Sequence, residues 1–273
     1  MFWTRFMSSM ILAVIALITL IMGGEVLWGV TLAISVIGYM ELCGAVNVHT
    51  KGKLNALEAV GLLGIAAYYA AVLFAEDELF WFMAVIFVFM GSMCVYVLTF
   101  PKYRSEQIMA NFFNFVYAPL MLSFLYLTRE LHYGEYIVWL ILISSWGCDT
   151  CAYLVGICIG KKKIFPHLSP KKSLEGCIGG VVGAGLIGAG FGYFVIEKAI
   201  PEQTVTLIIA FICMAGAIMS QIGDLAASAI KRNHDIKDYG RLIPGHGGIM
   251  DRFDSVIVTA PMIFFLAALL IQS

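Results

Sequence analysis

Two aspartates lie within stretches of this sequence that are otherwise apolar enough to cross a membrane. Asp149 follows the run Ser-Ser-Trp-Gly-Cys, and Asp224 stands in the run Gln-Ile-Gly-Asp-Leu-Ala-Ala-Ser. A charged side chain within a membrane helix costs about 2.5–3.5 kcal/mol on insertion scales, so such residues usually mark functional sites. Glu41, near the end of another apolar stretch, is explained more simply by a hydrogen bond between helices or by a side chain that reaches the membrane surface.

The segment 231–254 combines basic residues, glycines and acids in a pattern that suits a phosphate ligand. Its basic side chains can neutralise a polyphosphate, and they are Lys231, Arg232, Lys237, Arg241 and Arg252. The run Pro-Gly-His-Gly-Gly at 244–248 provides a flexible backbone whose N–H groups can bind anionic oxygens. A loop that merely faces anionic lipid headgroups would explain the basic residues, but not the glycines or the acids.

Three of the acids are candidate metal ligands. Asp251 and Asp254 are three residues apart, so a helix would place both carboxylates on one face. Mg²⁺ usually takes one or two carboxylates together with the phosphates of a substrate. We therefore predict that Asp224, Asp251 and Asp254 hold a metal ion.

A second basic segment covers residues 161–175 and reads Lys-Lys-Lys-Ile-Phe-Pro-His-Leu-Ser-Pro-Lys-Lys-Ser-Leu-Glu. Alone it could be a patch that contacts lipid headgroups. Because it follows the stretch that contains Asp149, we interpret it as the other wall of a phosphate site. Cys148 and Cys151 flank Asp149 in an apolar stretch without a second pair, so we expect them to pack rather than bind metal or exchange electrons.

The composition requires membrane helices to position these residues. Of 273 residues, 61% are hydrophobic and 13% are charged, whereas soluble domains are about 45–50% apolar and about 25% charged. The formal net charge of −1 argues against nucleic acid as a partner. Since a spanning helix needs about 20 apolar residues, we predict an all-α integral membrane protein with about nine transmembrane helices at 6–23, 26–46, 56–75, 79–100, 107–128, 136–160, 176–196, 204–230 and 255–272.

The positions of the basic residues predict how these helices are oriented. Lysine and arginine concentrate in cytoplasmic loops. With a cytoplasmic N-terminus and a C-terminus on the outer side, all of the 17 lysines and arginines except Arg129 and Lys198 fall on the cytoplasmic side. We expect residues 1–135 to serve packing and lipid binding, and residues 136–273 to form a catalytic transmembrane domain with loops 161–175 and 231–254. Glycines spaced four apart in 176–196 favour close helix packing, either inside the monomer or in a homodimer.

The motifs resemble those of the phosphatidate cytidylyltransferase (CDP-diacylglycerol synthase) family. Residues 228–254, with Ile-Lys-Arg, Lys-Asp, Ile-Pro, His-Gly-Gly-Ile and Asp-Arg-Phe-Asp in the family's spacing, are similar to its full signature. Gly-Asp-Leu at 223–225 resembles the segment that precedes this signature. Residues 149–161 and 169–176 resemble two further motifs, although threonine is commoner than Ser173 there. The resemblance covers residues 145–254 well, and the N-terminal helices only in hydropathy and at Glu41.

The resemblance implies that the cytidylyl group of CTP is transferred to phosphatidate, with Mg²⁺ as cofactor. It implies a bacterial cytoplasmic membrane protein whose site faces the cytoplasm, where CTP meets a lipid held in the bilayer. The implied catalytic residues are Asp224, Lys231, Arg232, Asp251, Arg252 and Asp254. The implied substrate-binding residues are Asp149, Ser169, Lys171, Lys172, Ser173, Ser228, Lys237, His246, Gly247 and Gly248, and Asp149 could orient a lysine or bind a second cation.

Two alternatives stay open from the sequence. A CTP-dependent lipid kinase of the dolichol or phytol type shares some of these motifs and would transfer the γ-phosphate, but the complete segment from 246 to 254 argues against it. An ion-coupled transporter would also place acids in membrane helices. Transporters usually show broken helices at the membrane midplane, whereas the acids here lie near one face.

Overall fold

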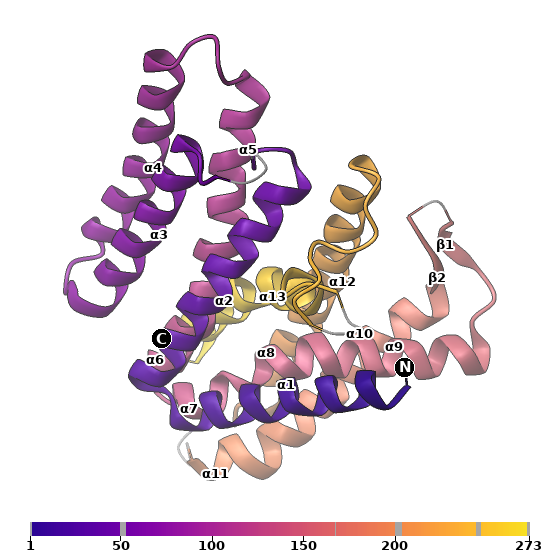
Figure 1. Ribbon diagram of the computed structural model, residues 1–273. Coiled ribbons are helices and arrows are strands. Elements are labelled where there is room, and N and C mark those ends of the chain that lie inside the picture. Colours follow the sequence, from indigo (N-terminus) through magenta and orange to yellow (C-terminus); the bar gives the residue numbers. More distant parts are fainter. Residues whose placement is uncertain (1, 50–52, 167, 200–203, 244–246, 272–273) are drawn as a thin grey trace. The chain divides into compact units, whose positions relative to one another are not determined.

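The computed structural model describes residues 2–49, 53–166, 168–199, 204–243 and 247–271, with side chains from Met10 onward. Apart from one β-hairpin, its named elements are helices (Figure 1). The longer helices are α1 (Phe2–Met22), α2 (Gly24–Ala45), α3 (Ala56–Phe74), α4 (Leu79–Leu98), α5 (Ser105–Phe115), α6 (Met121–Glu130), α9 (Cys148–Ile159), α10 (Leu174–Phe191), α12 (Thr206–Asn233) and α13 (Met250–Leu270). Some of these helices are extended by shorter segments. The short helices are α7 (Gly134–Ile137), α8 (Trp139–Leu142) and α11 (Glu197–Ala199), and the π-helical segments are η1 (Val116–Leu120), η2 (Ile143–Gly147) and η3 (Gly192–Ile196).

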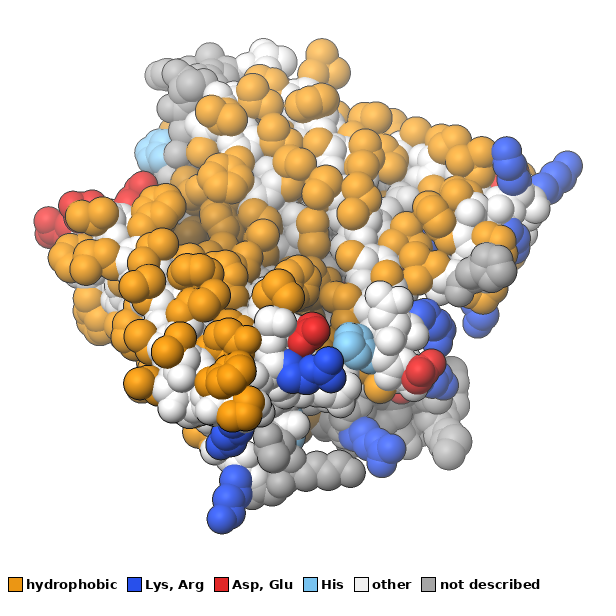
Figure 2. Space-filling model, turned by 90° about the horizontal axis from the view of Figure 1, so that it is seen from above, with side chains coloured by type: hydrophobic (Ala, Val, Ile, Leu, Met, Phe, Trp, Pro, Cys, Tyr) orange, Lys and Arg blue, Asp and Glu red, His pale blue; other side chains and the backbone are white. Residues whose placement is uncertain are grey.

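The described residues include 8 helical stretches that are long and apolar enough to cross a membrane, and a shorter apolar helix at Met10–Met22. This finding confirms the predicted all-α membrane protein. Figure 2 shows hydrophobic side chains over much of the visible face, as expected for a surface that meets lipid. The largest difference in bounds is at α13, which begins at Met250 rather than near 255, so that Asp251 and Asp254 both lie in its first turns. The orientation of the termini remains a prediction.

The chain forms two compact units that are interleaved along the sequence. The first contains Met1–Ala16, Glu25–Ser123 and His234–Arg252, and the second contains Leu17–Gly24, Phe124–Asn233 and Phe253–Ser273. The loop after α12 therefore belongs to the unit built from α2 to α5. The predicted division of roles at residue 135 stays a prediction.

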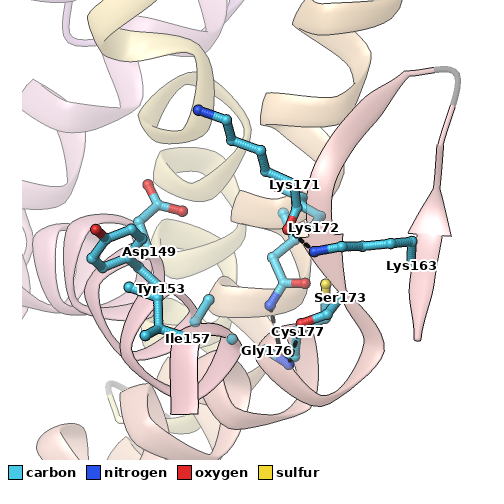
Figure 3. A pocket seen from close by; sticks show the side chains of 12 residues that line it. Asp149, Tyr153, Ile157, Lys163, Lys171, Lys172, Ser173, Gly176 and Cys177 are labelled. Carbon is cyan, nitrogen blue, oxygen red and sulfur yellow. Dashed lines mark hydrogen bonds between the residues drawn. The ribbon is translucent and has the colours of Figure 1, made fainter. Parts of the chain in front are cut away.

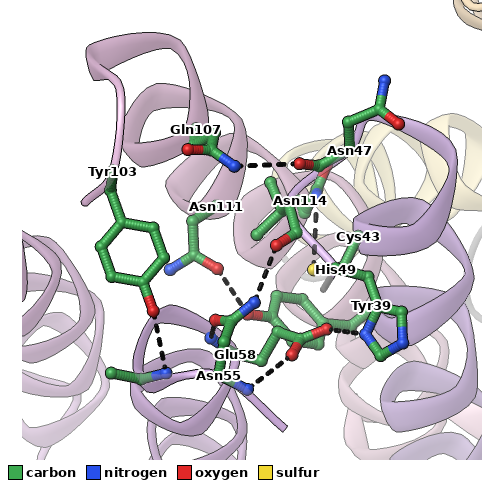
Figure 4. A network of polar contacts seen from close by, with 12 residues as sticks. Tyr39, Cys43, Asn47, His49, Asn55, Glu58, Tyr103, Gln107, Asn111 and Asn114 are labelled. Carbon is green, nitrogen blue, oxygen red and sulfur yellow. Dashed lines mark hydrogen bonds and ion pairs between the residues drawn. The ribbon is translucent and has the colours of Figure 1, made fainter. Parts of the chain in front are cut away.

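In the first unit, buried polar side chains connect α2, α3, α4 and α5 (Figure 4). The Tyr39 hydroxyl donates to Asn111 Oδ1 at 2.6 Å, and Asn111 Nδ2 donates to Ser92 Oγ at 3.1 Å. Glu58 is fully buried and pairs with His49 at 2.5 Å. These buried polar contacts fix the positions of neighbouring helices in the first unit.

Replacing Asn111 by alanine is expected to lower the stability of the first unit by about 1–3 kcal/mol, because Tyr39 and Ser92 would lose their buried partner. The unfolding midpoint of the protein in detergent measures this loss. Gln107 lies on the same helix, is half-buried, and donates to the Asn47 carbonyl at 3.0 Å, so Gln107→Ala is the matched control. An equal drop in both variants would contradict a special role for the buried amide.

The segment 161–175, which we expected to be a loop, contains a hairpin in the second unit (Figure 1). Strand β1 (Lys163–Phe165) pairs antiparallel with β2 (Ser169–Ser173). The Leu174 N–H donates to the Lys162 carbonyl at 2.8 Å, and Lys163 Nζ donates to the Lys171 carbonyl at 2.9 Å. Few apolar residues alternate along this segment, so its sequence lacks the pattern of a half-buried strand.

The glycines of α10 pack against two helices of the same unit. A β-carbon on Gly179 would lie 2.6 Å from Val155 in α9, and one on Gly188 would lie 2.5 Å from Cys213 in α12. Close helix packing inside the monomer is thus confirmed. The homodimer remains a prediction, because these glycine contacts all lie within one chain.

Candidate functional site

A cavity of about 330 Å³ opens in the second unit, within the size range of small-molecule sites. Figure 3 shows Asp149 and Tyr153, from α9, on one side and the lysines of the hairpin on the other. The lining residues are Asp149, Ala152, Tyr153, Gly156, Ile157, Lys163, Lys171, Lys172, Ser173, Gly176, Cys177 and Gln221. The interpretation of residues 161–175 as a wall that faces Asp149 is therefore supported by the geometry.

Ser173 joins the hairpin to α10. Its Oγ accepts a hydrogen bond from the Gly176 N–H at 3.2 Å and so caps the helix. A β-carbon on Gly160 would lie 2.5 Å from this Oγ, and one on Gly176 would lie 2.8 Å from the Ala152 carbonyl. These glycines let α9 and α10 meet around Ser173, which places the basic residues of β2 beside Asp149.

Opposite charges meet where α9, β2, α12 and α13 come together in the second unit. Lys172 forms an ion pair with Asp224, and the two side chains are 21% and 31% exposed. Lys172 also acts electrostatically on Asp149. Asp254 lies close enough to Asp224, Asp149 and Lys231 to interact with them electrostatically. Three acids and two lysines, all but one of them half-buried, thus form a charged cluster beside the cavity.

The predicted metal ligands fall in different units. Asp224 and Asp254 belong to the second unit, whereas Asp251 belongs to the first. The Asp251 carboxylate accepts hydrogen bonds from the backbone N–H groups of Tyr239 at 2.8 Å and Gly248 at 3.0 Å. In the described part of the chain, no three His, Cys, Asp or Glu side chains converge closely enough to hold an ion. Carboxylate oxygens nevertheless have the chemistry that Mg²⁺ prefers, so the metal assignment remains a prediction.

The loop after α12 is closed by its own backbone. The Ile243 N–H donates to the Gly247 carbonyl at 2.9 Å, and Gly247 has a φ of +88°. A β-carbon there would lie 2.8 Å from a carboxylate oxygen of Asp251. Only glycine suits this position, because other residues rarely adopt positive φ and would also clash. The predicted ligand His246 lies outside the described residues.

The remaining residues of the predicted site lie in β2, in α12 and in the first unit. Ser169 begins β2, Ser228 lies in α12, and Lys231 and Arg232 occupy the last turn of α12. Lys237 and Arg252 are exposed in the first unit. The structure therefore brings Asp149, Lys171, Lys172, Ser173, Asp224, Lys231 and Asp254 to one region of the second unit.

Gln221 is a site residue that the sequence analysis missed. Its Nε2 donates to the Cys177 carbonyl at 2.9 Å and to Cys148 Sγ at 3.3 Å, so it joins α12 to α10 and α9 at the cavity. Its position three residues before Asp224 in an apolar stretch was the available signal. Cys148 is buried with Ala184 and Ala217, which confirms the expected packing role of that cysteine.

Sequence comparisons relate this chain to known proteins. A family model described as "Cytidylyltransferase family" matches residues 3–270. The phosphatidate cytidylyltransferase of Bacillus subtilis (strain 168) is 42% identical over 137 residues, which cover 50% of this chain and 49% of that protein. The chain thus aligns with about half the length of that relative. The phosphatidate cytidylyltransferase of Staphylococcus aureus (strain COL) is 31% identical over 276 residues, covering 98% of this chain and 99% of the relative.

Proposed function

The chain belongs to the cytidylyltransferase family, and from this premise we propose that it transfers the cytidylyl group of CTP to phosphatidate. The observation that carries the proposal is the cavity of the second unit. Lys171 and Lys172 line one side of it, and Tyr153 and Ile157, which are 68% and 65% exposed, line the other. A phosphate with acyl chains needs this combination, because its head requires cations and its chains require an apolar surface.

In the proposed reaction, an oxygen of the phosphatidate phosphate attacks the α-phosphorus of CTP. A new bond joins this oxygen to the α-phosphorus, and the bond from the α-phosphorus to the β-phosphate oxygen breaks. CDP-diacylglycerol forms and pyrophosphate leaves. A phosphate monoester is already anionic near pH 7, so the nucleophile needs no strong base. Positioning and charge neutralisation then lower the barrier.

The charged cluster supplies these two effects. We assign Lys171, Lys172 and Lys231 to the neutralisation of phosphate oxygens, together with Arg232 of the same unit. Asp224 and Asp254, both of the second unit, would hold Mg²⁺, which supplies further positive charge at the phosphates when it is bound. The ion pair between Lys172 and Asp224 keeps both charges compensated in the free protein. A substrate phosphate can replace Asp224 as the partner of Lys172.

We further propose that the site faces the cytoplasm of a bacterium. The protein is an integral membrane protein with several apolar spans, and the relatives cited above come from bacteria. Both basic segments fall on the cytoplasmic side in the orientation that the positive residues favour. CTP arrives from that side, while phosphatidate stays in the bilayer.

The test uses the full chain purified in detergent, with phosphatidate, Mg²⁺ and CTP labelled at either the α- or the γ-phosphate. We expect label from the α position to enter lipid and label from the γ position to leave as pyrophosphate. Entry of γ-label into an added lipid alcohol would instead show a lipid kinase. If folded protein moves neither label into lipid, the proposed transfer is wrong.

A further inference from the structure

Glu41 accepts hydrogen bonds from backbone N–H groups at the start of α13. In the first unit, its Oε1 accepts from the Ile249 N–H at 3.0 Å and its Oε2 from the Met250 N–H at 2.9 Å. The first N–H groups of a helix have no partner inside the helix, and a carboxylate there also interacts favourably with the helix dipole. The helix is thus capped by a residue of α2 that lies more than 200 positions away, with sequence separations of 208 and 209.

The same carboxylate leaves no room for a side chain at two glycines of the loop. A β-carbon on Gly240 would lie 2.2 Å from Glu41 Oε1, and a β-carbon on Gly248 would lie 2.4 Å from Oε2. Neither glycine has a positive φ, so the close approach of Glu41, not an unusual backbone conformation, explains why glycine stands at both positions. Gly240 and Gly248 therefore both lie against the Glu41 carboxylate.

The hydrogen bonds of Glu41 connect directly to those of Asp251. Gly248 contacts Glu41, and its N–H donates to Asp251 Oδ2, which also accepts from the Tyr239 N–H. Two carboxylates thus accept the N–H groups of Tyr239, Gly248, Ile249 and Met250. Without Glu41, the Ile249 and Met250 N–H groups would lose their acceptors and the glycines would lose the group they pack against.

We propose that Glu41 is a positioning residue that holds residues 239–243 and 247–249 and the first turn of α13 in the conformation that receives the nucleotide phosphates. The proposal rests on the proposed cytidylyl transfer. It assigns a role to a side chain of the N-terminal helices, for which packing and lipid binding were the only predicted roles.

The first measurement compares Glu41→Gln with Glu25→Gln, an exposed carboxamide control at the start of the same helix. Glutamine keeps one acceptor and places an NH₂ group against the other N–H. We expect the KM for CTP to rise about tenfold, as for the loss of a charge-assisted hydrogen bond. The KM for phosphatidate and the unfolding midpoint should change little. A folded Glu41→Gln protein with unchanged kinetics would overturn the proposal.

The second measurement tests the contact between Glu41 and Gly248. Gly248→Ala alone should weaken CTP binding, because its methyl group meets the carboxylate. In the double variant with Glu41→Ala the methyl group has room, so the two losses should be less than additive. Strict additivity would show that the two residues act independently and would contradict the proposal.

Hydrogen exchange separates this proposal from the proposed activity. In Glu41→Ala, the amides of residues 248–251 should exchange about tenfold or more faster than in the unaltered protein, while those of α3 stay protected. This readout needs no turnover. If the unaltered protein lacks transferase activity but the exchange accelerates, the positioning holds and the assigned reaction fails. If exchange is unchanged, Glu41 does not hold the loop.

Discussion

Replacing Lys172 by methionine is expected to slow cytidylyl transfer by about 10²–10³-fold, the usual cost of removing one electrostatic donor from a reacting centre. Lys172 lines the cavity, pairs with Asp224 and acts on Asp149, so it interacts with two acids of the charged cluster. Methionine retains much of the apolar stem without the charge. The rate of entry of α-labelled cytidylyl into lipid measures the effect.

The loss of the Lys172 charge also affects folding, and a second variant separates the two effects. In Lys172→Met, Asp224 stays close to the other acids of the cluster without its ion-pair partner, so the unfolding midpoint should fall. Adding Asp224→Asn removes this repulsion and should restore the midpoint but not the activity. Lys198→Met, an exposed lysine of α11, is the control. Recovery of turnover in the double variant would show that Lys172 acts only on stability.

Replacing Asp254 by asparagine is expected to lower turnover by about 10²–10³-fold and to raise the Mg²⁺ concentration for half-maximal activity about tenfold or more. Asp254 sits in α13 and interacts electrostatically with Asp224 and Asp149, so its carboxylate belongs to the acidic part of the charged cluster. Asparagine keeps the shape and one oxygen but loses the charge. Turnover measured against Mg²⁺ concentration gives both quantities.

A neutralised acid elsewhere provides the comparison for Asp254→Asn. Glu76 is exposed in the connection between α3 and α4, and Glu76→Gln should leave the Mg²⁺ dependence unchanged. If Asp254→Asn kept full turnover at limiting Mg²⁺, Asp254 would not be a metal ligand.

The spans were predictable because their length and apolar composition are local properties. The predicted stretch 56–75 and the observed Ala56–Phe74 agree closely for this reason. The placement of residues 161–175 beside Asp149 was also predictable, because this segment directly follows the apolar stretch Gly134–Ile159 that contains Asp149 in its second half. The hairpin was not, because its strands depend on backbone hydrogen bonds between lysine-rich segments.

The contacts of Asp251 and Glu41 show what sequence reasoning could not reach. The spacing of Asp251 and Asp254 predicts a shared helix face, and the helix exists, but spacing cannot show that Asp251 accepts N–H groups of the preceding loop. For Glu41, a hydrogen bond between helices was one of two explanations, and it is confirmed. Its partner could not be identified, because a backbone N–H leaves no mark in the sequence.

The interleaving of the two units limits how this enzyme can be recombined with its relatives. The chain leaves the second unit after Asn233 and returns to it at Phe253, so residues 234–252 are an excursion into the first unit. A chimaera joined near residue 135 would pair the loop of one parent with the α2 of the other. A functional exchange should therefore move α2 and residues 234–252 together, although they lie near opposite ends of the chain.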